Sequence, residues 1–209
     1  MTEGGDWVEL EDYYSYYTNI YDYFFNNISE SISKYTFMKL NYFNNIFVNS
    51  CNIFFIILLL NKNSLLNFKC AIDLIGIDFY YKFRRFKLVY TLLNIFNSKR
   101  SCVFTSLAET SYIHTVSSVY QSFNWSEREI WDMFGIFFIN NNNLRRILND
   151  YGFKGYPLRK DFPLTGFIEL YYNNSLLDIC YRPVQLSQEL RFFNFSSCWD
   201  DDSSAINKI

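Results

Sequence analysis

The segment from Asn140 to Pro163 constrains the fold most, because it combines many cations with residues that interrupt regular structure. Its cations are Arg145, Arg146, Lys154, Arg159 and Lys160, and its carboxylates are Asp150 and Asp161, a balance of 5 − 2 = +3. The glycines and prolines at Gly152, Gly155, Pro157 and Pro163 exclude a long helix or a central strand. We therefore expect this segment to lie on another surface, held by carboxylates of this chain or of a partner protein.

The residues before this segment predict a short helix. Ser126 and Glu129 have the spacing of a capping box, which would start the helix at Ser126. Gly135 stands where a helix ends in a left-handed residue. Between these ends, Arg128 and Asp132 lie one turn apart and can form an ion pair, and the arginines further along the chain are also interpreted as partners of the helix carboxylates.

The remaining pattern predicts an α+β fold. Phe37, Leu40, Phe43 and Phe47 recur at helical spacing, which predicts a helix over residues 37–48. Strands are expected over 53–60, 70–77 and 85–95 and from 102 onwards, with a turn or short helix after the first strand and a polar turn at 98–101. A helical region is expected over 116–134, either continuous or restarting at Ser126, and a loop is expected at 140–143. Together they predict a small mixed β-sheet packed with helices, followed by a long extended C-terminal tail.

The domain organisation expected from these patterns has three parts. Residues 1–34 form an acidic, aromatic-rich extension, residues 35–139 the α+β domain, and residues 140–209 an extended tail that binds other subunits. The extension is interpreted either as a loosely ordered segment or as an aromatic arm that binds a neighbouring subunit.

The chain shows no targeting or membrane-spanning pattern. Residues 1–30 contain seven carboxylates and no Lys or Arg, whereas a transit peptide is rich in Arg and poor in acids. The longest apolar run, over 53–60, is too short for a spanning helix, which needs about 20 residues. We therefore expect a protein that is either cytosolic or made inside the compartment where it works, with at most a peripheral place at a membrane.

The residues that could carry chemistry are better explained by structural roles. Glu127, Glu129 and Asp132 could form an acid/base set, with Glu129 and Asp132 near one helix face, but no nucleophile or phosphate loop accompanies them. The five cysteines have no C-x-x-C spacing and the single histidine is His114, so we expect buried or half-buried free thiols and no metal site.

Composition leaves two classes of partner open. Aromatic residues make up 22% of the chain, which reflects AT-rich codons and suggests aromatic contacts with other proteins. The basic segment, with Tyr151, Phe153 and Tyr156 between its cations, also resembles a nucleic-acid platform. However, the formal charge of −2 argues against a dedicated polyanion binder, and an organellar ribosomal or RNA-binding protein is kept as the alternative.

Three motifs in order, EREIWDMFG, LRRILNDYGFKG and PLRKDFPLTG, resemble the signature of the thirty-kilodalton subunit of NADH:quinone oxidoreductase, respiratory complex I. The likeness covers residues 83–199 and continues through Glu169, Pro183, Val184, Gln188, Glu189, Phe195 and Trp199. The chain departs from the family pattern at Asn142-Asn143, where the family usually has His-Pro, at Tyr156, where it has His, and at Cys198, where it has Pro.

The resemblance implies a core structural subunit of the quinone-reducing module of mitochondrial NADH:ubiquinone oxidoreductase, in the peripheral arm on the matrix side of the inner membrane. It implies that this chain binds no cofactor itself, and that FMN, iron–sulfur clusters and ubiquinone are bound elsewhere in the complex. The implied partners are the large quinone-site subunit and the iron–sulfur subunits. The residues expected at these contacts are Glu127, Arg128, Glu129, Asp132, Arg145, Arg146, Asp150, Tyr151, Arg159, Lys160, Asp161, Phe162 and Pro163.

Overall fold

The structure, a computed structural model, describes residues 36–40, 43–191 and 193. It divides into two compact units, Met1–Leu164 and Thr165–Ile209. The expected N-terminal extension over 1–34, together with Phe195, Cys198 and Trp199, lies outside the described residues.

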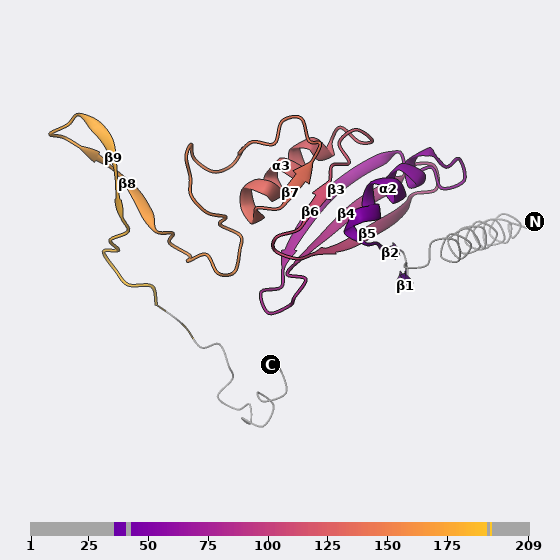
Figure 1. The fold of residues 1–209 in the computed structure, drawn as a ribbon, viewed down its shortest axis with the longest axis horizontal. Coiled ribbons are helices and arrows are strands. Elements are labelled where there is room, and N and C mark those ends of the chain that lie inside the picture. The colour runs from indigo at the N-terminus through magenta and orange to yellow at the C-terminus, as the bar shows by residue number, and fades with distance from the viewer. Residues whose placement is uncertain (1–35, 41–42, 192, 194–209) are drawn as a thin grey trace, which may run out of the picture. The chain divides into compact units, whose positions relative to one another are not determined.

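A five-stranded mixed sheet forms the centre of the first unit (Figure 1). Its strands, in spatial order, are β1 (Thr36–Leu40), β2 (Phe43–Phe47), β5 (Lys99–Leu107), β4 (Phe86–Asn94) and β3 (Cys70–Asp78). The β2–β5 pair is parallel and the other pairs are antiparallel. This confirms the predicted α+β class and the predicted strands at 70–77 and 85–95.

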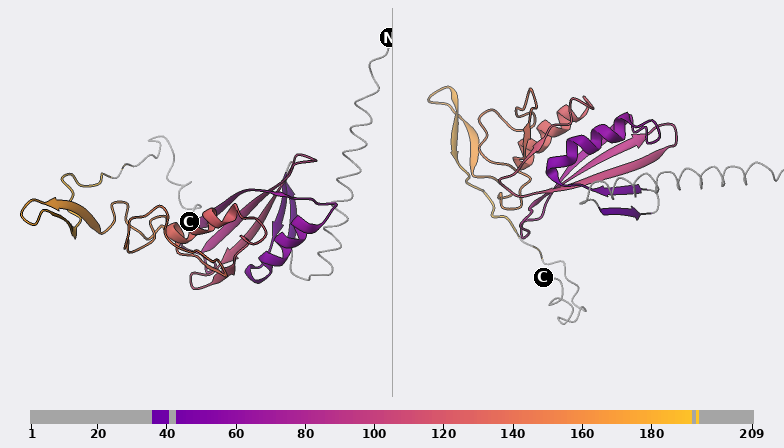
Figure 2. Two further views of the ribbon diagram at one scale, coloured as in Figure 1. Left: turned by 90° about the horizontal axis from the view of Figure 1, so that it is seen from above. Right: turned by 45° about the vertical axis from the view of Figure 1, so that its right-hand side comes forward.

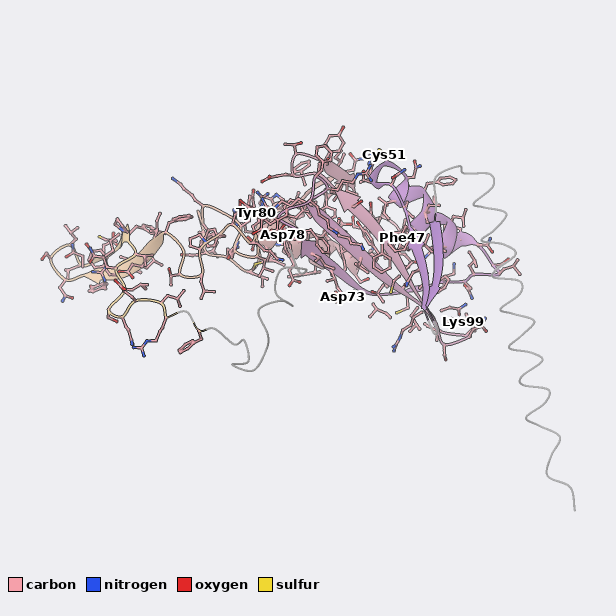
Figure 3. All side chains as sticks on the ribbon, turned by 90° about the horizontal axis from the view of Figure 1, so that it is seen from below. Phe47, Cys51, Asp73, Asp78, Tyr80 and Lys99 are labelled. Atoms are coloured by element: carbon pink, nitrogen blue, oxygen red, sulfur yellow. The ribbon has the colours of Figure 1, made fainter. Side chains whose placement is uncertain are left out.

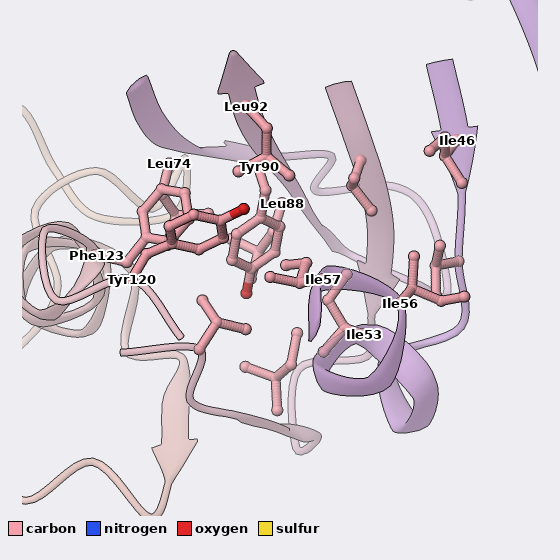
Figure 4. Packing of buried hydrophobic residues seen from close by; sticks show 14 of the residues in the cluster. Ile46, Ile53, Ile56, Ile57, Leu74, Leu88, Tyr90, Leu92, Tyr120 and Phe123 are labelled. Carbon is pink, nitrogen blue, oxygen red and sulfur yellow. The ribbon is translucent and has the colours of Figure 1, made fainter. Parts of the chain in front are cut away.

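Two helices, α2 (Ile53–Lys62) and α3 (Phe123–Phe134), pack on one face of this sheet (Figure 2). Alternate side chains of β4, among them Leu88 and Tyr90, are fully buried beneath them. The Tyr90 ring meets the Phe123 ring edge to face, with centroids 5.6 Å apart (Figure 4). Burial of this alternating stripe against the helices forms the hydrophobic core.

The apolar run at 53–60 is a helix, so the predicted strand is wrong. Its buried residues, Ile53, Ile56, Ile57 and Leu60, recur at i, i+3, i+4 and i+7, which is one face of a helix. A short continuous apolar run does not distinguish a buried strand from a buried helix, and here packing on the sheet selects the helix. The residues after it form a turn, as predicted.

The predicted helix over residues 37–48 is also wrong, because this stretch forms β1 and β2. Ile46 and Val48 are buried while Phe47 between them is half-buried, which is the period of a strand. Pairing with β1 on one side and with β5 on the other supplies the backbone hydrogen bonds of β2, and the long-range contact with β5 overrides the local helical spacing.

The boundaries of two further elements differ from the prediction. The polar turn occupies residues 95–98, and Lys99 already begins β5. Helix α3 starts at Phe123, so Ser126 lies inside it and the predicted capping box does not form. The C-terminus is as predicted: Gly135 has φ 77° and its N–H donates to the Trp131 carbonyl.

Short elements complete the first unit. The 3-10 helix η1 (Ser50–Asn52) precedes α2, and β6 (Tyr112–His114) pairs in parallel with β7 (Phe137–Ile139) on either side of α3 in the sequence. Residues 140–164 contain no helix or strand, and 140–143 form a loop as predicted.

The second unit contains an antiparallel hairpin, β8 (Ile168–Asn173) with β9 (Asp178–Pro183). The predicted extended tail therefore includes paired strands. The signal for them was the alternation in Ile168-Glu-Leu-Tyr-Tyr followed by the turn residues Asn173, Asn174 and Ser175.

Candidate subunit interface

Asp132, near the end of α3, holds the start of the basic segment. Its side chain is fully buried, and Oδ1 lies 2.7 Å from Nη1 of Arg146 and 2.8 Å from Nδ2 of Asn149. Its Oδ2 accepts the backbone N–H groups of Ile147, Leu148 and Asn149 at 3.2, 2.8 and 2.9 Å. Because one carboxylate accepts all these hydrogen bonds, it holds the backbone of residues 146–149 against the end of α3.

The pKa of Asp132 reflects this arrangement. Burial by itself would raise the pKa, but the hydrogen bonds from the Asn149 and Leu148 N–H groups, the Asn149 amide and Arg146 outweigh it and lower the pKa to about 2. Asp132 is therefore a permanent anion at neutral pH. It has no partner in Arg128, because the Arg128 Nε donates to the Arg145 carbonyl instead, at 3.3 Å, and the predicted Arg128–Asp132 pair is wrong.

Glu127 is the second fully buried acid of α3. Its Oε2 accepts the Thr115 hydroxyl at 2.5 Å and the Asn141 amide at 2.8 Å, and its Oε1 accepts the Val116 N–H at 2.8 Å. Burial raises the pKa of Glu127, although these hydrogen bonds partly oppose the rise. Glu127 thus fixes the chain before α3 and the four-asparagine loop to the same helix.

Glu129 differs from both acids. It is exposed, whereas Glu127 and Asp132 are buried. The prediction that Glu129 and Asp132 share a face is therefore wrong, and the three carboxylates do not form an acid/base set.

Arg85, the residue directly before β4, is the centre of a second ion network. Its Nε and Nη2 donate to the two oxygens of Asp78 at 2.8 and 2.9 Å, and Nη2 also reaches Asp161 Oδ1 at 2.6 Å. These hydrogen bonds raise the pKa of Arg85 and lower the pKa of both Asp78 and Asp161. Asp78, labelled in Figure 3, also accepts the Lys160 N–H at 2.9 Å. The turn between β3 and β4 is thereby tied to the end of the basic segment.

Arg159 closes the same network from the other side. Its Nη1 lies 2.8 Å from Glu109 Oε1, and its Nε donates to the Phe134 carbonyl at the end of α3 at 2.6 Å. Its guanidinium lies 4.7 Å from the centroid of the Tyr156 ring. A cation that donates to a carbonyl at the end of a helix is also stabilised by the negative end of the helix dipole.

The contact of Arg159 and Tyr156 with the end of α3 requires a glycine at position 135. Its φ of 77° is left-handed, and a Cβ placed on it would lie 2.6 Å from Cε2 of Tyr156 and 2.8 Å from Nη2 of Arg159. The absence of a side chain lets the basic segment pass directly over the end of α3.

The structure therefore brings together most of the residues that the sequence singled out, but many are bound within the chain. Glu127, Asp132 and Arg128 are buried, and Arg146, Arg159, Phe162 and Pro163 are half-buried. Exposed side chains are those of Glu129, Arg145, Asp150, Tyr151, Lys160 and Asp161. Sequence reasoning missed Asp78, Arg85, Glu109, Thr115, Asn141 and Asn149. No local motif joins them to the predicted residues, because the contacts between the two sets span 12 to 82 positions of the chain.

The hairpin presents a surface of a different kind. One face carries Ile168, Leu170, Tyr172, Ile179 and Tyr181, which are 49–65% exposed. The opposite face pairs Glu169 with Arg182, whose Nε lies 2.5 Å from Oε1. Exposed apolar patches of this kind are typical of surfaces that contact other molecules.

The cysteine side chains are dispersed. Cys51, Cys70, Cys102 and Cys180 are free thiols, and Cys51 is exposed, contrary to the expectation of burial. The described residues include no group of three or more His, Cys, Asp or Glu that could hold a metal ion, so their donor set does not fit an iron–sulfur cluster. Within the same residues, no helix has the length and apolarity to cross a membrane.

Known proteins resemble this chain over most of its length. A chain of the archaeal membrane-bound sulfane sulfur reductase has the same fold, with a TM-score of 0.59 and 23% identity over 68% of this chain and 85% of that one. NADH-ubiquinone oxidoreductase subunit 9 of Acanthamoeba castellanii is 45% identical over 165 residues, 78% of this chain and 84% of that protein. NADH dehydrogenase (ubiquinone) iron-sulfur protein 3 of Oryza sativa subsp. japonica is 41% identical over 77% of this chain and 84% of that protein.

The three motifs that suggested the family lie within the residues that match the family as a whole. Residues 46–168 match the 30 kDa subunit of respiratory-chain NADH dehydrogenase, and this span includes both helices, most of the sheet and the ion networks. The relatives give no support to the alternative of an organellar ribosomal or RNA-binding protein. With more than half of its residues matched and relatives above 40% identity, the chain belongs to the family of the 30 kDa subunit of respiratory-chain NADH dehydrogenase.

Proposed function

We propose that this chain is a positional subunit of mitochondrial NADH:ubiquinone oxidoreductase, in the quinone-reducing module of the peripheral arm on the matrix side. It supports electron transfer from NADH to ubiquinone by holding neighbouring subunits in place, and binds no flavin, iron–sulfur cluster or quinone itself. The observation that carries the proposal is the row of exposed apolar and aromatic side chains on one face of the β8–β9 hairpin.

An isolated two-stranded hairpin is marginally stable in water, because it has no second layer on which to bury side chains. The cross-strand pairs Leu170–Tyr181 and Tyr172–Ile179 gather apolar and aromatic groups on one face, while Glu169–Arg182 keeps the other face polar. Aromatic residues are enriched at the centres of protein interfaces. We infer that this face packs on the large quinone-site subunit.

The first unit presents a second surface for contacts with other subunits. The buried anions Asp132 and Asp78 fix the basic segment, and its outward side then presents Leu148, Tyr151 and Leu158, which are 57, 95 and 54% exposed. In this proposal, Arg145, Asp150, Tyr151 and Lys160 touch the iron–sulfur subunits. Arg146 and Arg159 shape that surface from within.

The test compares two exposed positions of the hairpin in the intact complex. Tyr172→Asp places a charge on the apolar face, and we expect less assembled complex on blue-native gels and a parallel loss of NADH:ubiquinone turnover. Asn174→Asp, in the exposed hairpin loop, adds the same charge off that face and should assemble normally. Normal assembly and turnover of the Tyr172 variant would contradict the proposal.

A further inference from the structure

Residues 79–84, in the turn between β3 and β4, project from the end of the sheet (Figure 1). Two aromatic side chains of this turn lie almost wholly in solvent: Tyr81 is 96% exposed and Phe83 is 92% exposed. Neither ring takes part in the ion networks of the first unit or in the apolar face of the hairpin. Exposed aromatic groups gathered at one place on a protein are typical of a surface that binds another molecule.

The turn is held in one conformation from its base. The Phe79 N–H donates to the Arg85 carbonyl at 2.8 Å, which closes the turn. The Arg85 guanidinium, fixed by Asp78, lies 5.1 Å from the centroid of the Tyr80 ring, and both Asp78 and Tyr80 are labelled in Figure 3. The Tyr80 ring meets the Tyr81 ring edge to face, with centroids 5.2 Å apart. A side chain that is already positioned loses little freedom on binding, so this turn is suited to docking.

The exposed part of the turn is cationic. Residues 79–108 contain six cations and no carboxylate. Of these cations, Arg85 is neutralised by Asp78. Lys82 and Arg84 are exposed, and neither forms an ion pair with another residue that the structure describes. A partner with carboxylates would complement this charge.

The surroundings of the turn favour an acidic protein over an anionic lipid surface. Glu109 and Asp161 lie at its base, where they reach Arg85 at 3.4 and 2.6 Å, and their side chains are 51 and 43% exposed. A flat layer of lipid phosphates would meet these two carboxylates as well as the cations, and like charges repel. A protein surface can place its own carboxylates opposite the cations alone.

We propose that the β3–β4 turn docks into a neighbouring protein subunit, with Tyr81 and Phe83 in an apolar pocket of that subunit and its carboxylates beside Lys82 and Arg84. Aromatic residues and arginine provide most of the binding energy at protein interfaces. The inference rests on the proposed function, because it adds a third contact surface to those of the hairpin and the basic segment.

Hydroxyl-radical footprinting tests whether another molecule covers the two rings. The oxidation rates of Tyr81 and Phe83 are measured in the purified full-length chain and in the intact complex of inner-membrane preparations. Both rates should fall about tenfold in the complex, because aromatic anchors of an interface are almost fully desolvated.

Tyr172 of the hairpin reports on the proposed function in the same spectra. Unchanged rates at Tyr81 and Phe83 together with a protected Tyr172 would overturn the docking of the turn and leave the hairpin contact standing. Protected Tyr81 and Phe83 with an unprotected Tyr172 would support the docking of the turn and contradict the hairpin contact.

A zero-length carbodiimide cross-linker identifies the chemistry of the partner, because it joins a lysine amine to a carboxylate that touches it. Mass spectrometry of the cross-linked complex should find Lys82 joined to an Asp or Glu of another subunit. The proposal is overturned if Lys82 is joined only to this chain or to no carboxylate. Protection of Tyr81 that disappears when lipid is removed would also overturn it, in favour of a lipid contact.

Charge reversal at the same position provides an independent test. Lys82→Glu should raise the oxidation rate of Tyr81 in the complex by roughly fivefold, the upper range for an exposed ion pair. Lys82→Arg keeps the charge and should behave as the unaltered chain, as should Lys62→Glu, which makes the same reversal at an exposed position of α2. Equal oxidation rates for Lys82→Glu and Lys62→Glu would refute the acidic partner.

Discussion

The carboxylate of Asp132 lies 2.7 Å from the guanidinium of Arg146, fourteen residues further along the chain. Arg146 also reaches the Gly155 carbonyl at 3.2 Å and lies 5.3 Å from the centroid of the Tyr156 ring. One arginine therefore links the end of α3 to two later parts of the basic segment. This link explains how a stretch without helix or strand keeps a defined conformation.

Asp132→Asn should destabilise the first unit by about 2–4 kcal/mol, because an amide group then faces donors that now share a buried carboxylate. The measurement is urea unfolding of the full-length chain at neutral pH. Asp150→Asn is the matched control, since Asp150 is exposed and its carboxylate, among the described residues, accepts only the N–H of Tyr151, at 2.7 Å. The control should change the free energy of unfolding by less than about 0.5 kcal/mol. Equal effects would show that the Asp132 network contributes little.

The lowered pKa of Asp132 predicts a stability loss in acid. In the folded state its pKa is about 2, below the ordinary value of 3.8. The folded state therefore binds the proton less readily, so the stabilisation is complete above about pH 4 and is lost as the pH falls towards 2. It amounts to about 2 kcal/mol, from 1.4 kcal/mol per pKa unit. The difference in unfolding free energy between the unaltered chain and Asp132→Asn should shrink over this range, and a constant difference would contradict the assignment.

Glu127 should show the opposite dependence. Because burial raises its pKa, the folded state binds this proton more readily, and the contribution of Glu127 to stability falls as the pH rises through the folded pKa. Glu127→Gln removes the titration, so the substitution should cost more free energy at acidic pH than at neutral pH. Glu129→Gln is the matched control, since it makes the same change at an exposed position of the same helix. Chemical unfolding at several pH values measures both variants.

Arg85→Lys should lower the free energy of unfolding by about 2–4 kcal/mol, although the charge is kept. Lysine cannot reproduce the two-pronged contact with Asp78 while it also reaches Asp161. The neighbouring Arg84→Lys is the control, because Arg84 is exposed and its guanidinium donates only to Ser106 within the part of the chain that the structure describes. Thermal unfolding followed by circular dichroism should separate the two variants. Equal melting temperatures would mean that the Arg85 network adds charge but no specific geometry.

Gly135→Ala and Gly152→Ala separate backbone strain from steric overlap. Both glycines have left-handed φ values, 77° and 69°, so each substitution should cost about 1–2 kcal/mol in backbone conformation. Only Gly135 of this pair has neighbours that a Cβ would strike, whereas nothing lies within 4 Å at Gly152. Gly135→Ala should therefore destabilise the chain clearly more in urea unfolding. Equal losses would show that Tyr156 and Arg159 move aside freely.

Local signals in the sequence were sufficient to predict those features that depend only on neighbouring residues. Gly135 ended α3 as predicted, and the alternating stretch at 85–95 formed β4. The ordered motifs around residues 127–166 identified the family. Each of these signals depends on nearby residues, so no knowledge of distant contacts was needed.

Tertiary contacts decided the rest. The apolar run at 53–60 became a helix because a sheet face was available for it, and Phe43–Phe47 became strand β2 because β5 offered a partner. Asp132 took Arg146 rather than Arg128, since the returning segment brought several backbone N–H groups to the same carboxylate. The sequence alone determined that the cationic segment needed carboxylates, and only the folded chain determined that many of them are its own.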